Sequence, residues 1–289
     1  MKPFKEIVVV SGKGGTGKTT LTAALAAAIP NKVIADTDVD AANLHLLLQP
    51  ENSVPTEFRG MDIAEINPAQ CTACGLCRDS CAFHAVEEHQ NSFQVDPTAC
   101  EGCTLCSLVC PAQAIAMKPR IVGHWIASDT SFGRMIHARL KPGGENSGHL
   151  VTMVRLQAKH QALEHQCGTI IIDGPPGIGC PVNAALTGTD IAILVTEPTQ
   201  SGISDLRRLL KLIDHFDIPV GIIINRFDVH LENSRCIEAF CQETGAPVLG
   251  KIPHSYQIIE AISEARIPIN LCQELDNTVS AIKDMIAAL

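Results

Sequence analysis

Aromatic residues and long apolar runs are both scarce in this 289-residue chain, which has one Trp, one Tyr and eight Phe. No apolar run reaches the roughly 18 residues that a membrane-spanning helix needs, and residues 1–10 carry no signal-peptide cleavage site. Positively charged residues are also few: the chain has 22 Lys and Arg against 31 Asp and Glu, which gives a formal charge of −9. Without a basic stripe, we expect neither nucleic-acid binding nor membrane insertion. The 46% of hydrophobic residues predict a globular, cytoplasmic protein with a substantial core.

Short apolar runs alternate with helix-like segments, which predicts an α/β fold with a doubly wound parallel sheet. Strands are expected at residues 7–10, 33–35, 169–172, 191–195, 220–224 and 248–252, and helices at 18–29, 154–166, 204–215, 234–243 and 277–289. Residues 123–148 are rich in Gly, His and Ser without a clear period, so we expect a long surface connection there. The eleven histidines form no HxxxH or HxH pair, and we expect them at the surface.

A complete phosphate-binding loop, GKGGTGKT, lies between the first predicted strand and the first predicted helix. In such a loop successive backbone N–H groups point at phosphate oxygens, while Lys18 supplies a positive charge and Thr19 a hydroxyl for Mg²⁺. The predicted nucleotide-binding residues of this segment are Gly12, Lys13, Gly14, Gly15, Thr16, Gly17, Lys18, Thr19 and Thr20.

The variant KGGTGKT, with Lys13 two places before Gly15, resembles the deviant Walker ATPases, the family of MinD, ParA, Mrp and the nitrogenase iron protein. The resemblance covers residues 4–48 and about 150–289. It implies a P-loop ATPase that uses ATP and Mg²⁺ as a homodimer, or as a heterodimer with a paralogous ATPase. Lys13 would reach the partner's nucleotide, and Lys13 and Lys18 would both serve catalysis.

Two carboxylate segments are similar to the switches of that family. Asp36 stands where a carboxylate approaches Mg²⁺, and Asp38, which we favour over Asp40, where one orients the attacking water. Asp173 matches the Walker B carboxylate, so the resemblance implies Mg²⁺ ligation by Thr19, Asp36 and Asp173.

Three further positions resemble nucleotide contacts of the family. The backbone N–H of Gly177 could reach the γ-phosphate, Asn225 resembles the residue that reads adenine, and the loop at Pro253 resembles the segment that covers the base. An Asn at a strand end is also a common turn former.

Eight of the thirteen cysteines form two copies of the spacing CxxCxxCxxxC. This spacing is typical of bacterial ferredoxin segments that bind 4Fe-4S clusters, in which the fourth cysteine ligates the other cluster. Cytoplasmic thiols stay reduced, which favours metal over disulfides. The predicted ligands are Cys71, Cys74, Cys77 and Cys110 for one cluster and Cys100, Cys103, Cys106 and Cys81 for the other. Two tetrahedral zinc sites are the alternative, but zinc does not require a third cysteine at this repeated spacing.

The helix and strand periodicity stops where the cysteines begin. We therefore predict three segments: residues 1–60 as the first part of a P-loop ATPase domain, 61–118 as an inserted bacterial-type ferredoxin domain of α+β type, and 119–289 as the second part of the ATPase domain. The whole chain resembles Mrp/MinD-like ATPases that carry such an insert.

Cys180 lies outside both repeats, seven residues after Asp173. In the nitrogenase iron protein a cysteine at this offset holds a cluster shared between subunits, which implies a transient metal site near Cys180. The companion cysteine, expected in residues 142–148, is missing, and the other interpretation is a small buried residue. No late CPxC pair typical of cluster-assembly scaffolds is present.

Three functions follow, in order of preference. The first is an ATPase that couples nucleotide-driven dimer switching to low-potential electron transfer toward a redox partner. The second is an ATPase of iron-sulfur or metallocluster assembly, with a metalloprotein client and a cargo near Cys180. The third, a positioning ATPase of the MinD kind, fits less well because Lys283 is the only cation of the last predicted helix.

Overall fold

A computed structural model describes residues 3–141 and 147–289, and these divide into two compact units. Of the described residues, the large unit comprises 3–56, 125–139 and 147–289, and the small unit comprises 57–124 and 140–141. Within the described residues, no helix has both the length and the apolar character needed to cross a membrane.

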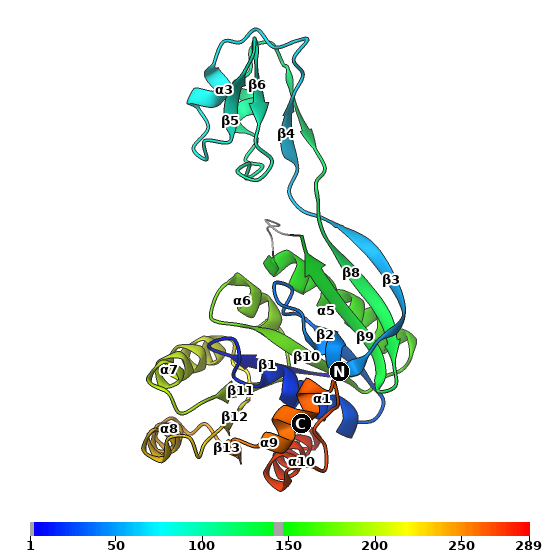
Figure 1. Cartoon of the computed structure of the whole chain (residues 1–289), viewed down its shortest axis with the longest axis vertical. Helices are drawn as coiled ribbons and strands as arrows, with labels where there is room; N and C mark the ends of the chain where they lie inside the picture. Colours follow the sequence, from blue (N-terminus) through cyan, green and yellow to red (C-terminus); the bar gives the residue numbers. More distant parts are fainter. Residues whose placement is uncertain (1–2, 142–146) are drawn as a thin grey trace. The chain divides into compact units, whose positions relative to one another are not determined.

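A nine-stranded sheet, built mostly of parallel strands, organises the large unit, with strand order β13-β12-β11-β1-β10-β2-β9-β8-β3 (Figure 1). The strands are β1 (Lys5–Ser11), β2 (Lys32–Asp36), β3 (Glu51–Arg59), β8 (Ile121–Thr130), β9 (Gly133–Leu140), β10 (Thr169–Pro176), β11 (Ile191–Thr196), β12 (Val220–Asn225) and β13 (Val248–Ile252). Each predicted strand falls within an observed one, and β1 lies between β10 and β11 in parallel register. The predicted α/β fold with a large parallel sheet is confirmed.

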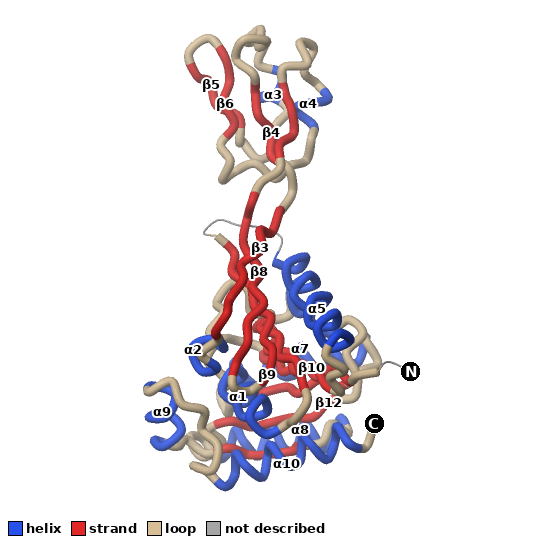
Figure 2. Tube along the Cα trace, turned by 90° about the vertical axis from the view of Figure 1, so that its right-hand side faces the viewer, coloured by secondary structure: helices blue, strands red, loops and turns tan. Residues whose placement is uncertain are grey.

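Helices cover both faces of this sheet (Figure 2). On one face lie α1 (Lys18–Ala28), α2 (Leu44–Leu48), α9 (Tyr256–Ser263) and α10 (Gln273–Ala287), and on the other α5 (Ser147–Glu164), α6 (Cys180–Leu186), α7 (Gln200–His215) and α8 (Leu231–Thr244). Apolar side chains of β1, α1 and α10 form one buried cluster that includes Ile7, Val9, Leu21, Leu275 and Ile282. The sequence missed α2, α6 and α9, which are short.

The expectation of a long surface connection over residues 123–148 is wrong. The segment contains most of β8, all of β9 and the beginning of α5, with residues 142–146 outside the described part. A two-residue turn joins β8 to β9, and β9 pairs in parallel with β2 and buries Met135, Ile136 and Ala138 completely. Polar residues between these apolar ones hid the strand, because a buried strand in a covered sheet does not need a strict alternation.

Besides the ends of β3 and β8, the small unit contains two antiparallel pairs and two single-turn helices. Its elements are β4 (Ile63–Ile66), α3 (Leu76–Asp79), β5 (Val86–His89), β6 (Ser92–Val95), α4 (Leu105–Leu108) and β7 (Ile115–Lys118). β4 pairs with β7, and β5 pairs with β6. Cys77, Val86 and Phe93 form a small buried cluster. Five of the residues packed around it are cysteines or isoleucines, namely Ile66, Cys71, Cys81, Cys106 and Ile115.

Candidate functional site

The phosphate-binding loop connects β1 to α1 at the carboxyl end of the central strand. Gly17 caps α1 with φ 97°, a left-handed conformation that favours glycine, and no side chain caps the helix. The first N–H groups of α1 therefore face the loop, which suits a phosphate. Gly12 is required for another reason, since an added Cβ would lie 2.1 Å from the Cβ of Asp205 on α7.

Two buried carboxylates, Asp36 at the end of β2 and Asp173 in β10, lie beside this loop. Asp173 is 1% exposed and accepts hydrogen bonds from the hydroxyls of Thr19 (2.7 Å) and Thr22 (3.0 Å). Asp36 is fully buried and accepts from the backbone N–H of Leu44 at 3.2 Å. The structure thus brings together the three side chains predicted to hold Mg²⁺, and their oxygen atoms are the donors that Mg²⁺ prefers.

Burial shapes the protonation of these acids. Burial and the neighbouring Asp173 raise the pKa of Asp36 well above its ordinary value. Burial raises the pKa of Asp173 to about 6, against the hydrogen bond from Thr19 and the charge of Lys18. Burial also raises the pKa of Asp38, which is only partly exposed and feels the positive charge of Lys18. A cation bound between these two acids would favour their charged forms and lower both pKa values.

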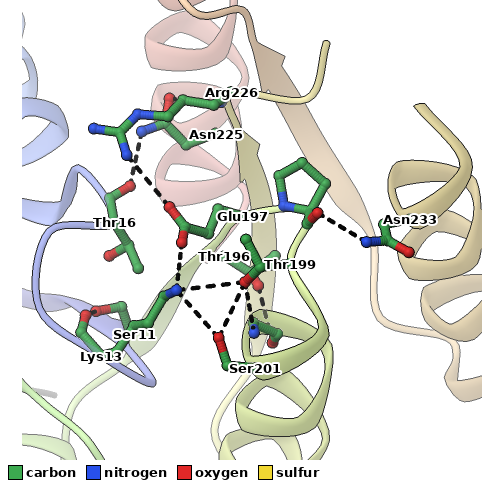
Figure 3. A network of polar contacts seen from close by, with 12 residues as sticks. Ser11, Lys13, Thr16, Thr196, Glu197, Thr199, Ser201, Asn225, Arg226 and Asn233 are labelled. Carbon is green, nitrogen blue, oxygen red and sulfur yellow. Dashed lines mark hydrogen bonds and ion pairs between the residues drawn. The ribbon is translucent and has the colours of Figure 1, made fainter. Parts of the chain in front are cut away.

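Lys13 is bound within its own chain. Its Nζ lies 2.5 Å from a carboxylate oxygen of Glu197 and donates hydrogen bonds to the hydroxyls of Thr199 (3.4 Å) and Ser201 (3.2 Å) (Figure 3). The other oxygen of Glu197 lies 3.4 Å from Arg226. Sequence reasoning missed Glu197, although its place directly after an apolar strand, at the ligand-binding edge of the sheet, was a usable signal.

A cavity beside the loop contains the two residues predicted to contact the base. Asn225 and Pro253 line it together with Gly17 and Arg226. The amide of Asn225 donates to the carbonyl of Thr16 at 2.7 Å, which fixes the side chain over the phosphate loop.

The remaining predicted positions of the large unit lie after β10. The N–H of Gly177 donates to the carbonyl of Ser11 at 2.9 Å, so it would have to leave this partner to reach a phosphate. Cys180 is exposed at the start of α6, and its backbone carbonyl is close to Gly148. The exposed position argues against the interpretation of Cys180 as a small core residue.

The eight repeated cysteines gather in two cavities of the small unit. One cavity is lined by Cys71, Cys74, Cys77 and Cys110. The other is lined by Cys81, Cys100, Cys103 and Cys106. Each cavity thus combines three cysteines of one repeat with the fourth cysteine of the other repeat.

Backbone hydrogen bonds point at some of these sulfurs. The N–H of Ala73 donates to Sγ of Cys71 at 3.4 Å, and the N–H of Ala114 donates to Sγ of Cys110 at 3.3 Å. Such bonds stabilise a thiolate. Among the described residues, no group of three or more His, Cys, Asp or Glu side chains has the arrangement of a single metal-ion site. The fit to a cluster rests instead on the donor set, four soft thiol ligands around one cavity.

The expectation that every histidine lies at the surface is wrong for His137. This residue of β9 is 7% exposed, and its ring lies 5.7 Å from that of His45, centroid to centroid. Burial, followed by the charge of His45, lowers the pKa of His137 to about 4. The Nδ1 atoms of both rings are buried without a hydrogen-bond partner within the described structure. The register of β9 beside β2 explains the burial, because His137 pairs with Asp36.

Comparisons with known proteins agree with this geometry. Residues 7–269 match the family described as CobQ/CobB/MinD/ParA nucleotide binding domain. An uncharacterized protein of Methanocaldococcus jannaschii is 34% identical over 224 residues, which cover 76% of this chain and 78% of that protein. The septum site-determining protein MinD of Synechocystis is 27% identical over 262 residues, covering 88% and 77%. The structure of MinD with Mg-ADP from Pyrococcus horikoshii has the same fold, with a TM-score of 0.59 at 20% identity over 98% of this chain and 97% of that one.

Proposed function

The chain belongs to the CobQ/CobB/MinD/ParA family of nucleotide-binding domains and is a P-loop ATPase, and from this premise we propose that ATP-driven dimer switching controls low-potential electron transfer through two 4Fe-4S clusters. One observation carries the proposal. Each cavity of the small unit, taken here as the inserted ferredoxin domain, is lined by the four cysteines that a two-cluster ferredoxin would use. The clusters would supply one-electron chemistry, and the eight thiols would hold them.

The ATP chemistry uses the acids and the loop. Lys18 and the N–H groups at the start of α1 would bind phosphate, and Thr19, Asp36 and Asp173 would hold Mg²⁺. Asp38, near the charge of Lys18, orients the attacking water. Lys13 joins a nucleotide across the dimer only after it leaves Glu197.

Coupling between the two activities follows from the order of the chain. The cysteine segment is inserted after the acidic segment that contains Asp38 and before β10, in which Asp173 lies. Nucleotide-dependent movement of either segment would therefore displace the chain that leads into or out of the cluster-binding unit. The redox partner would be a separate protein.

Metal content tests the cluster proposal directly. After anaerobic purification of the full chain, we expect about eight irons and equal sulfide per chain. Cys71→Ser and Cys100→Ser should each lose about four irons, whereas Cys236→Ser, an exposed cysteine outside both cavities, should lose none. Zinc in place of iron, or equal losses in all three variants, would refute the proposal.

A separate experiment tests gating. Addition of MgATP should change the midpoint potential of at least one cluster, and Lys18→Ala should abolish the change because it removes nucleotide binding. A potential and a rate of electron release that both ignore MgATP would exclude ATP control, even with both clusters present.

The exposure of Cys180 supports the second function, assembly or insertion of a metallocluster. Under that proposal a metal cargo binds near Cys180 and leaves on ATP hydrolysis, so Cys180→Ala should lower the metal content in a nucleotide-dependent way. An iron content that is the same in Cys180→Ala and wild type, with and without ATP, would exclude the cargo.

A further inference from the structure

A surface groove of about 770 Å³ lies on the small unit, over β4 and β6. The residues of β4 and β6 line the groove, together with three cations: Lys118, Arg120 and Lys141. The guanidinium of Arg120 donates to the carbonyl of Pro97 at 2.7 Å, which fixes one side of the groove.

The charge of this groove differs from that of the unit around it. The described residues of the small unit include eight Asp and Glu but five Lys and Arg, and three of those five cations line the groove. Glu65 is the one acidic residue in the described lining of the groove. Its pair with Lys118, at 3.8 Å between exposed side chains, neutralises little charge. An acidic unit, in a chain of formal charge −9, therefore presents a local positive patch.

Single side chains separate this groove from both cysteine cavities. Ile66 and Phe93 line the groove and also the cavity of Cys71. Ala64 and Val95 line the groove and also the cavity of Cys81. Electron tunnelling weakens steeply with distance, so a molecule in the groove would occupy the favourable side for exchange with either set of thiols.

Resting on the proposed function of those cavities, we propose that the groove is the docking site of an acidic one-electron carrier protein. Carboxylates of the carrier would contact Lys118, Arg120 and Lys141, and its redox centre would face Ile66 and Phe93. One electron leaves a reduced cluster and enters the oxidised carrier, with no bond made or broken. A nucleic acid is disfavoured because its affinity depends on many phosphate contacts, and the groove offers three cations.

The test measures oxidation of the anaerobically reduced full-length protein by an acidic flavodoxin in a stopped-flow instrument. The double variant Lys118→Gln/Lys141→Gln should lower the second-order rate constant about tenfold at low ionic strength and flatten its salt dependence, because steering by opposite charges is lost. The control Arg59→Gln/Lys283→Gln removes the same charge outside the groove and should change the rate less than about twofold. Equal effects of both double variants would overturn the proposal.

Carbodiimide cross-linking gives a readout that does not depend on the clusters. Cross-links between flavodoxin carboxylates and this protein should map to Lys118 and Lys141. Cross-links in the groove without electron transfer would refute the electron-transfer function and leave the docking site standing. Electron transfer with cross-links elsewhere would refute the docking site alone. Hexacyanoferrate(III) serves as a small-anion probe: if its rate responds to the groove variants and flavodoxin forms no cross-link, the groove binds small anions and the protein-docking proposal is wrong.

Discussion

The substitution Asp173→Asn should stabilise the nucleotide-free, metal-free protein, and by more at pH 8 than at pH 5. Asp173 is 1% exposed, and burial raises its pKa to about 6 from the ordinary 3.8. The folded protein therefore holds the proton more tightly than the unfolded chain. The stabilisation of the folded state by this bound proton is fully present below pH 3.8 and is lost as the pH rises through 6. Asparagine cannot lose that proton, and its amide can keep the contacts with Thr19 and Thr22.

The size of the effect follows from the pKa difference. About two pKa units at 1.36 kcal/mol each correspond to about 3 kcal/mol of unfolding free energy at pH 8. At pH 5 the wild-type carboxyl is still mostly protonated in the folded state, and the advantage of Asn falls to about 1.5 kcal/mol. Loss of the negative charge also relieves Asp36, whose pKa Asp173 helps to raise, and this adds to the advantage.

Urea unfolding in EDTA, followed by the fluorescence of the single tryptophan, Trp125, measures both values. Asp284→Asn, a change at an exposed site on α10, is the matched control and should have no effect at either pH. With saturating MgADP the order should reverse, since the variant loses one of the two carboxylates proposed for Mg²⁺. An advantage of Asp173→Asn that does not grow between pH 5 and pH 8 would refute the argument that burial opposes the charge.

Three further predictions concern other buried or paired groups. Glu197→Gln weakens the hold on Lys13, a pair worth about 1 kcal/mol at this exposure, and should strengthen MgATP-dependent dimerisation about fivefold in sedimentation experiments; weaker dimerisation would contradict it. Arg155→Met removes a buried ion pair with Glu6 at 2.6 Å and two hydrogen bonds to the end of α6. The unfolding free energy should therefore fall by about 3 kcal/mol, and the double variant Arg155→Met/Glu6→Gln should recover part of this loss. His137→Gln should make the protein less sensitive to acid unfolding. The folded wild type has a His137 pKa of about 4, so it loses about 3 kcal/mol of unfolding free energy as the pH falls from 6.5 through 4. Urea unfolding at several pH values measures this loss.

The central strands could be predicted from sequence because each is a short continuous apolar run bounded by turn residues. Residues 191–195 are an example: the observed strand β11 is buried throughout, so no polar residue interrupts the pattern. The phosphate loop was equally visible, since its glycines and Lys18 act through local backbone geometry. The placement of Asp36 and Asp173 beside the loop could be predicted for a related reason: the carboxyl ends of parallel strands meet at one edge of the sheet, and both residues lie at the end of such an apolar run.

Features that depend on distant pairing could not be predicted in this way. β9 carries Arg, His and Gly among its apolar residues, and it becomes recognisable as a buried strand only beside β2. His137 was expected at the surface for the same reason, since its burial comes from that pairing and from the ring of His45. The spacing of each cysteine repeat is local, whereas the gathering of Cys110 with Cys71 depends on how the β4–β7 pair brings the two ends of the segment together.

Lys13 shows why a motif can predict a role and still miss the state of the residue. The motif implies that Lys13 reaches the nucleotide of a second subunit, while in the single chain Glu197 binds it at 2.5 Å. The role in the dimer and the contact in the single chain are compatible only if the ion pair between Lys13 and Glu197 opens when the dimer forms. Glu197 would not then be left as an isolated buried charge, because Arg226 lies 3.4 Å from its other oxygen. Because Arg226 remains as a second partner, opening the pair between Lys13 and Glu197 costs less free energy. The contact can therefore act as a reversible two-state element. A nucleotide phosphate that attracts Lys13 more strongly than the carboxylate does would shift this element toward the dimer.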